Sequence, residues 1–385
     1  MIDIVTKDSC CGCGACAQIC PKGCITLQAD GEGFLYPKVD AKTCVECGLC
    51  ETVCPILQSE KTAVREPLEV FAACGEEKLL RLDSSSGGIF SLLAESVLAQ
   101  GGVVFGAAFA EDFSVRHVGV DSVDGLDKLR GSKYVQSRTE NTYKETKLAL
   151  EQGRPVLYSG VGCQIAGLKR FLGKEYEGLV TVDVLCHGVP SPKVWQRYVR
   201  HCEGQRNSVL TKVSFRSKKR GWHNYETEQC FQNGQVQRIA HGKDPYIQMF
   251  LSEICLRPSC HSCKFREGRS GADITLGDAW GIERWMPEMD DDKGTSVVFI
   301  NSRKGKTLWD LVQDRVKARI ADPETVIRNN MVYRNSVKPH PSRARFFKAL
   351  NSGASVDQLI QLTKAPLWRR ILSFGKRCVK KILGR

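Results

Sequence analysis

The sequence predicts an α/β protein with some α+β character, made of a small cysteine-rich N-terminal unit and a larger body. In the first unit, cysteines recur in two evenly spaced runs. In the body, short apolar segments alternate with amphipathic helical segments, which favours a mainly parallel sheet with flanking helices. Beyond residue 208, alternating β-rich segments replace that pattern. A length of 385 residues is enough for about two to three domains.

The two cysteine runs predict a metal-cluster unit over residues 1–57. They consist of Cys10, Cys13, Cys16 and Cys20 before Pro21, and of Cys44, Cys47, Cys50 and Cys54 before Pro55. Both read C-x2-C-x2-C-x3-C-P, the spacing of bacterial two-cluster ferredoxins, in which the fourth cysteine serves the other cluster. One 4Fe–4S cluster is therefore assigned to Cys10, Cys13, Cys16 and Cys54, and the other to Cys44, Cys47, Cys50 and Cys20. Zinc sites use paired rather than triple spacing, and Cys11 and Cys24 are expected to be bystanders.

The composition and the charge of the chain limit the compartment and the partners that we expect for the protein. The N-terminus lacks the basic and apolar regions of a signal peptide, and thiolates that bind iron need a reducing compartment, so we expect a cytoplasmic protein. No run of 18 apolar residues indicates a membrane span. The formal net charge is +13, and residues 364–385 carry eight Lys and Arg with no acid. Because the charge is concentrated in one tail without a binding motif, we expect no nucleic-acid partner.

Residues 56–68 read as a linker, and the main body is predicted over residues 66–345. Strands are expected at 69–74, 103–110, 115–120, 156–159 and 179–185, and helices at 89–100, 139–152 and 164–172. Further strands are expected at 209–215, 225–231, 236–240, 272–281 and 296–301, and helices at 244–253 and 306–319. Asn233-Gly234 is a typical hairpin turn.

A second group of cysteines predicts another metal site in the body. Cys163 and Cys186 each follow a buried strand, and parallel strands bring such positions to one edge of a sheet, where α/β proteins bind ligands. Cys260 and Cys263 form a C-x2-C pair. Together these four are predicted to hold a third 4Fe–4S cluster, with Cys255 as a reserve ligand. A zinc site and buried cysteines without a ligand remain open as alternatives.

The body also offers turns that could hold a flavin. Iron–sulfur clusters transfer single electrons, whereas most organic substrates take two, and a flavin converts between the two modes. No G-x-G-x-x-G or G-x4-G-K-[ST] motif is present. The serine–glycine turn at residues 84–88 precedes a helix and could cradle a phosphate. Residues 131–134 offer a hydroxyl, a cation and an aromatic ring. His187, beside Cys186, is a candidate proton donor, although a lone histidine is more often a structural loop residue.

The order of seven motifs resembles a known family. SSSGGIF, GSKYVQS, YSGVGCQIAGLK, DVLCHGVPSP, FRSKKRGW, LRPSCHSCKF and ADITLGDAWGI occur in this order, as in the beta subunits of coenzyme F420 hydrogenases and dehydrogenases. The resemblance implies FAD, a body 4Fe–4S cluster and hydride exchange at the flavin. It implies a flavin site at Ser86, Gly87, Gly88, Ser132, Lys133 and Tyr134, and cluster ligands at Cys186, Cys260 and Cys263. Separately from the resemblance, His187 and Lys133 are predicted to be catalytic. Gly162 stands where members often have proline, which leaves Cys163 less certain.

These features predict an iron–sulfur flavoprotein oxidoreductase that passes electrons between ferredoxin-type donors and an organic substrate through 4Fe–4S clusters and FAD. The expected partners are a ferredoxin or another electron-transfer protein, and a small organic substrate or a deazaflavin. One alternative is a non-catalytic electron-transfer subunit of a larger redox complex. Another is a membrane-peripheral reductase in polysaccharide or lipid-linked precursor biosynthesis.

The second alternative depends on the basic tail at residues 364–385. Apolar residues recur there at i, i+3 and i+4, with Lys and Arg on the other face. This pattern is typical of a helix that lies in an anionic membrane interface, and predicts association with the inner face of the membrane. A helix docked on the body would show the same apolar stripe.

Overall fold

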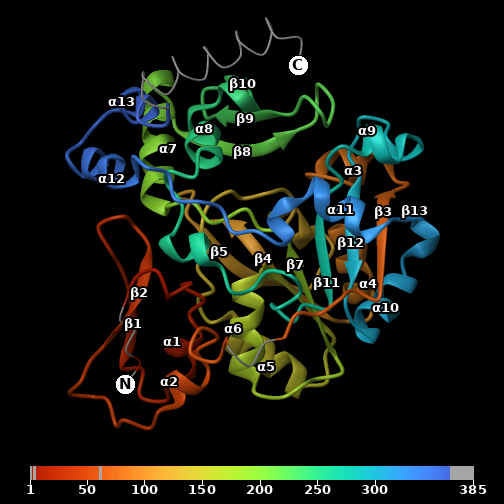
Figure 1. Cartoon of the computed structure of the whole chain (residues 1–385), viewed down its shortest axis with the longest axis horizontal. Coiled ribbons are helices and arrows are strands. Elements are labelled where there is room, and N and C mark those ends of the chain that lie inside the picture. Colours follow the sequence, from red (N-terminus) through yellow and green to blue (C-terminus); the bar gives the residue numbers. More distant parts are fainter. Residues whose placement is uncertain (1, 3–5, 60–62, 365–385) are drawn as a thin grey trace, which may run out of the picture.

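The computed structural model describes residues 2, 6–59 and 63–364 (Figure 1). The predicted membrane-binding tail, apart from Lys364, lies outside the described residues. The expected α/β class, with a small N-terminal unit beside a larger sheet, is confirmed. Among the described helices, none is long and apolar enough to cross a membrane.

The N-terminal unit repeats one short pattern twice. Its elements are α1 (Ala15–Ile19), β1 (Ile25–Ala29), β2 (Leu35–Val39) and α2 (Leu49–Thr52), and the two strands pair antiparallel. Each helix begins directly after a left-handed glycine, Gly14 (φ 79°) and Gly48 (φ 74°). Both glycines stand at the same place in their cysteine run, between the second and third cysteines, so the sequence repeat is also a backbone repeat.

The body is organised around an eight-stranded mixed sheet (Figure 1). In spatial order its strands are β13 (Val316–Ile320), β3 (Glu69–Gly75), β12 (Ser296–Ile300), β11 (Ile274–Asp278), β7 (Leu179–Val184), β6 (Val156–Val161), β4 (Val103–Phe109) and β5 (Val115–Val120). The four neighbours β4, β6, β7 and β11 run parallel, and the outer pairings are antiparallel. The carboxyl ends of the parallel strands therefore share one edge.

Helices cover both faces of this sheet. One face packs against α3 (Lys78–Asp83), α4 (Ile89–Ala99) and α10 (Arg303–Asp310). The other face packs against α5 (Thr142–Glu151), α6 (Gly162–Leu172), α9 (Ile282–Trp285) and α11 (Pro323–Asn329). Helix α1 of the N-terminal unit packs on α5 and α6, so the two parts share one apolar core.

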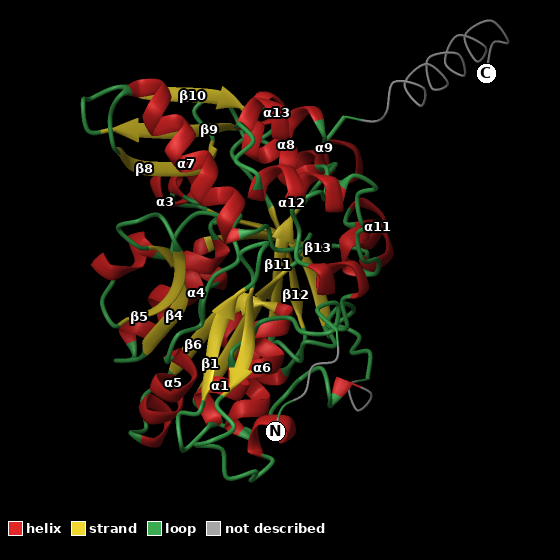
Figure 2. Cartoon of the chain, turned by 90° about the vertical axis from the view of Figure 1, so that its left-hand side faces the viewer, coloured by secondary structure: helices red, strands yellow, loops and turns green. Residues whose placement is uncertain are grey.

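A second, three-stranded antiparallel sheet lies beyond the carboxyl edge (Figure 2). It contains β8 (Leu210–Ser217), β9 (Glu226–Phe231) and β10 (Val236–Ala240), in agreement with the alternating pattern of the sequence. Its core includes side chains from α7 (Pro192–Arg206), α8 (Pro245–Leu251), α12 (Arg343–Asn351) and α13 (Val356–Gln361). This layer closes the space above the main sheet, where the candidate site lies.

Candidate iron–sulfur and cofactor site

The N-terminal cysteines form two groups that match the predicted crossing of the fourth ligands. Cys16 lies close enough to Cys10 and Cys54 to interact with both electrostatically, and Cys13 interacts with Cys16 in the same way. Burial, followed by these neighbouring thiols, raises the pKa of Cys16 to about 12. Iron ligation requires thiolates, so cluster binding at such a site would release protons. Four thiols crowded at one buried point fit the donor set of a 4Fe–4S cluster.

The other group lies nearer the surface. A small cavity is lined by five cysteines, Cys20, Cys24, Cys44, Cys47 and Cys50. Four of these are the predicted ligands of the second cluster. Cys24, expected to be a bystander, lies with its Sγ 3.3 Å from the Sγ of Cys20. Cys47, together with the apolar side chains Val45 and Leu49, is exposed, so this cluster position faces solvent.

The body cysteines line a cavity of about 310 Å³. We call it the third cavity, because it holds the third group of cysteines. Its wall includes all four predicted ligands, Cys163, Cys186, Cys260 and Cys263. Cys163 lies at the start of α6 and Cys186 just beyond β7, so the parallel pair β6–β7 brings them together. The reserve ligand Cys255 is fully buried in the core beneath the second sheet and does not line this cavity. The four-thiol wall fits a 4Fe–4S cluster.

Cys11 is a further cysteine in the wall of this third cavity. It shares an apolar core with Cys13 and lines this cavity together with Cys163. Cys11 lies outside the C-x2-C spacing of the predicted ligands. The spacing within one segment could not predict which body residues lie near Cys11.

A larger cavity of about 530 Å³ adjoins the third one at the carboxyl edge of the parallel strands. The two cavities share wall residues, among them Val161, Cys163, Val184, Leu185, Cys186 and Val332. A volume of several hundred Å³ with mostly apolar walls is typical of cofactor sites. The predicted flavin residues Ser86, Gly88, Ser132, Lys133 and Tyr134 lie in its wall, and Gly87 lies between Ser86 and Gly88.

The serine–glycine turn is held tightly at the start of α4. A Cβ at Gly87 would lie 2.5 Å from the carbonyl oxygen of Ala73 and 2.9 Å from the amide nitrogen of Ser296. Gly88 has φ 84° and serves as the N-cap of α4. Ser85 accepts a hydrogen bond from the amide of Ser132 at 2.7 Å, joining the two predicted flavin turns. This arrangement leaves α4 pointing its N-terminus, which favours anions, at the cavity.

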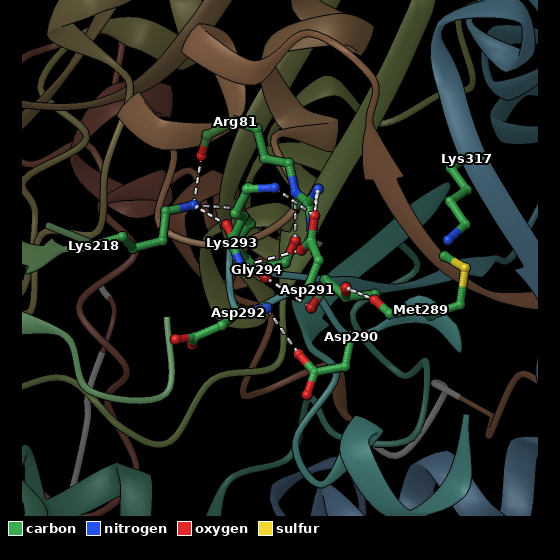
Figure 3. A network of polar contacts seen from close by, with 12 residues as sticks. Arg81, Lys218, Met289, Asp290, Asp291, Asp292, Lys293, Gly294 and Lys317 are labelled. Atoms are coloured by element: carbon green, nitrogen blue, oxygen red, sulfur yellow. Dashed lines mark hydrogen bonds and ion pairs between the residues drawn. The ribbon is translucent and has the colours of Figure 1, made fainter. Parts of the chain in front are cut away.

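A network of polar contacts around Lys218 and Arg81 (Figure 3) also holds this turn in place. Nζ of Lys218 donates to the carbonyl oxygens of Arg81, Ser86 and Lys293 at 2.5, 2.8 and 2.8 Å. Arg81 in turn pairs with Asp291 and donates through Nε to the carbonyl of Gly294. Burial lowers the pKa of Lys218 to about 7, but three acceptors match the three N–H donors of the ammonium form. Lys218 thus ties the 291–294 loop to the turn.

The two predicted catalytic residues both lie in the cavity wall. Nζ of Lys133 donates to the carbonyls of Lys128 and Arg130, which leaves one ammonium N–H for a ligand. Burial lowers the pKa of Lys133 to about 7. The ring of His187 packs edge-on against Phe250 at 5.3 Å, and its Nε2 lies 3.7 Å from Glu253. Their catalytic roles stay predictions.

Residues that sequence reasoning missed also face the cavity. His117 donates from Nε2 to the carbonyl of Ser159 at 2.9 Å and stacks on Tyr158. Arg216 pairs with Asp278 through both terminal nitrogens and lies 5.2 Å from the ring of Trp280. The basic motif FRSKKRGW was a usable signal for Arg216, whereas nothing in the sequence around His117 distinguishes it from a surface strand residue.

The site therefore defines an iron–sulfur protein of the electron-transfer class, whose cysteine cavities lead to a cofactor-sized cavity in an α/β body. Residues 9–56 match the model of the 4Fe-4S dicluster domain. Residues 153–326 match the family described as the C terminus of the beta subunit of coenzyme F420 hydrogenase/dehydrogenase. The second match agrees with the resemblance that the seven motifs predicted, and the first agrees with the predicted N-terminal pair of 4Fe–4S clusters.

One similar solved structure is described as xenon derivatization of the F420-reducing NiFe hydrogenase complex from Methanosarcina barkeri. The identity is 18%, the match covers 78% of this chain and 91% of that one, and the TM-score is 0.47. No curated protein matches the sequence.

Proposed function

We propose that this chain is an iron–sulfur flavoprotein oxidoreductase, which passes electrons between a ferredoxin-type donor and an organic substrate. The observation that carries the proposal is the shared wall between the third cysteine cavity and the larger cavity, at Cys163 and Cys186. A cluster held by these thiols would lie directly beside whatever fills the larger cavity. Proximity of this kind is what electron transfer between two bound groups requires.

The larger cavity fits FAD. The N-terminus of α4 and the serine–glycine turn would hold its phosphates, and Ser132 would complete the turn through Ser85. FAD, when bound, supplies the conversion between single-electron and hydride transfer. Arg216, held by Asp278 with Tyr225 and Trp280 against its guanidinium, closes the opposite wall. The second sheet therefore contributes to this wall through β8, which carries Arg216.

Anaerobic purification with iron, sulfide and flavin quantitation tests the proposal. Three clusters and one flavin correspond to about 12 iron atoms and one FAD per chain. Replacing Cys260 by Ser should remove about four iron atoms, whereas replacing the buried core residue Cys202 by Ser should remove none. About eight iron atoms and no flavin in the unaltered chain would reduce it to an electron-transfer subunit and overturn the flavoenzyme proposal.

A further inference from the structure

Helices α7 and α12 carry a large excess of basic side chains. Together they contain seven Lys and Arg and one acid, Glu203. The Glu203 carboxylate accepts a hydrogen bond from the backbone amide of Leu210 at 3.0 Å. Arg343 of α12 pairs with Glu32 of the N-terminal unit. The other basic residues of the two helices leave a positive charge that these acids do not offset.

Four of these residues form one surface, which we call the basic face: Lys193 and Arg197 of α7, and Arg345 and Lys348 of α12. Nζ of Lys193 donates to Oδ1 of Asn351, the last residue of α12, at 2.6 Å. Nη2 of Arg197 lies 3.9 Å from the position of a Cβ at Gly353. Because Arg345, Lys348 and Asn351 follow one another at i, i+3 spacing, they lie along one side of α12, and this side adjoins α7.

The basic face has no acidic partner in the part of the chain that the structure describes. None of its four side chains has a carboxylate at ion-pair distance there. Lys193, Arg345 and Lys348 are exposed, and Arg197 is half-buried. The opposite sides of the two helices are apolar and buried in the core beneath the second sheet. An unpaired basic surface of this kind attracts an anionic partner.

The basic tail begins beside this face. Helix α13 packs against both α7 and α12, and the described chain ends at Lys364, shortly after α13. Residues 364–385 carry eight Lys and Arg and no acid, and their apolar residues recur at i, i+3 and i+4. An anionic bilayer takes up both basic and apolar side chains, whereas nucleic-acid phosphates take up only the basic ones. The tail therefore favours a lipid surface as the partner of this end of the molecule.

We propose that the basic face and the basic tail together dock the protein on an anionic lipid bilayer. The sequence predicted this contact from the tail alone, and the basic face gives the folded body a contact of its own. Stable attachment to a bilayer generally takes two such signals. Figure 1 shows α2, which begins just after Cys47, at the opposite end of the molecule from α13. The docked protein therefore leaves the exposed cysteine group open to a soluble donor.

The inference goes beyond the proposed function and does not depend on bound clusters or flavin. Its test is sedimentation of the full chain with phosphatidylcholine vesicles that contain or lack phosphatidylglycerol. The wild type should bind only the vesicles with anionic lipid, and should bind them less tightly as the salt concentration rises. Each Lys or Arg near an anionic surface strengthens binding about fivefold, so Arg345→Gln with Lys348→Gln should bind about 30-fold more weakly.

A second double variant and a matched control accompany this measurement. Lys193→Gln with Arg197→Gln should show the same loss, which covers the case of a poorly folded α12 variant. Lys144→Gln with Lys147→Gln removes the same charge from exposed positions on α5. Figure 1 shows α5 at the end of the molecule away from α13, so this control should bind as the wild type does.

Four results would overturn the proposal. The first is a wild type that does not bind anionic vesicles, and the second is wild-type affinity in both basic-face variants, which would leave the contact to the tail. The third is an equal loss in the α5 control, which would show a response to net charge alone. The fourth is a single-stranded oligonucleotide that binds the wild type more tightly than the vesicles do and loses affinity in the same variants. That result would assign the basic face to nucleic acid instead.

Discussion

At the scale of single residues, His117 shows how a buried group makes stability depend on pH. Its Nε2 donates to the carbonyl of Ser159, and its Nδ1 lies 3.1 Å from the hydroxyl of Ser137, so both partners suit the neutral ring. Burial lowers the pKa of His117 to about 4. The unfolded chain, with an ordinary pKa of about 6.5, therefore binds the proton first as the pH falls.

We expect the free energy of unfolding to decrease as the pH falls from about 6.5 toward 4, and to lose about 2 kcal/mol between pH 7 and pH 5 from this residue alone. Replacing His117 by Gln, which keeps a donor for Ser159, should remove that part of the pH dependence. Urea unfolding of both proteins under anaerobic conditions at the two pH values measures it. Equal slopes in the two proteins would contradict the buried neutral state.

The position of a single residue could be predicted where the sequence pattern that marks it lies within one short segment. The ligand spacing of Cys10, Cys13 and Cys16 is local, and the structure gathers these thiols as expected. Cys11 and Cys24 lie outside this spacing, yet both stand beside predicted ligands. Cys24 contacts Cys20 within the same segment, whereas only the packing of separate segments brings Cys11 into one cavity wall with Cys163. His117 lies on a strand whose sequence shows no sign of its burial, because the neighbours that cover it come from residues 137 and 158–160.

At the scale of elements, the turn before α4 is the part of the candidate flavin site with the least space. We expect Gly87→Ala to abolish flavin binding and to destabilise the fold, because the added Cβ would press on backbone atoms of both β3 and β12. The measurement is the ratio of flavin absorbance to protein, with urea unfolding of the same samples.

Gly204 in α7 gives a matched control. A Cβ there meets nothing within 4 Å, and alanine favours a helix interior by up to about 1 kcal/mol over glycine. Gly204→Ala should therefore keep its flavin and be equally or more stable. A Gly87→Ala protein with a full flavin complement would show that this turn does not hold the cofactor.

Elements were predictable where a single strand or helix carried its own pattern. The strands of the second sheet and the four parallel strands of the main sheet follow from alternation and from buried runs, respectively. The expected helix at 306–319 was wrong at its end, because Val316–Ile320 form strand β13. The antiparallel pairing of β3, β12 and β13 did not follow, because it depends on partners more than 200 residues apart. Lys218 likewise reads as one of several basic residues in a motif, although its three carbonyl partners come from α3, from the turn that follows it and from the 291–294 loop.

At the scale of the whole molecule, the cysteine groups form a series from the surface to the larger cavity. The exposed group at Cys47 comes first, the buried group at Cys16 follows, and the third cavity lies beyond Cys11. The cysteine motifs in the sequence predict which residues form each group of this series. Their order in space depends on how α1 packs against α6, which no single-segment pattern encodes.

Arg257 is the side chain that holds the two parts together most extensively. It is fully buried, donates to the carbonyls of Cys10 and Leu35, and lies 4.3 Å above the ring of Tyr36. A third donor reaches Oε1 of Gln136. Because hydrogen bonds from a charged group contribute about 1.5–3 kcal/mol each, we expect Arg257→Ala to cost about 3 kcal/mol or more. Arg257→Lys keeps the charge but loses the planar set of donors, so it should retain only part of the stability that Arg257→Ala loses.

If electrons pass from the N-terminal unit into the body across the contact that Arg257 holds, Arg257→Ala should also slow the reduction of the third cluster. The iron content should stay unchanged. Stopped-flow reduction by a reduced ferredoxin, followed by freeze-quench electron paramagnetic resonance, separates the clusters in time. Arg200 on α7 provides the control, since Arg200→Ala removes the same kind of side chain from a solvent-exposed position. An Arg257→Ala protein that unfolds at the wild-type urea concentration and reduces its third cluster at the wild-type rate would show that rigid docking is not needed.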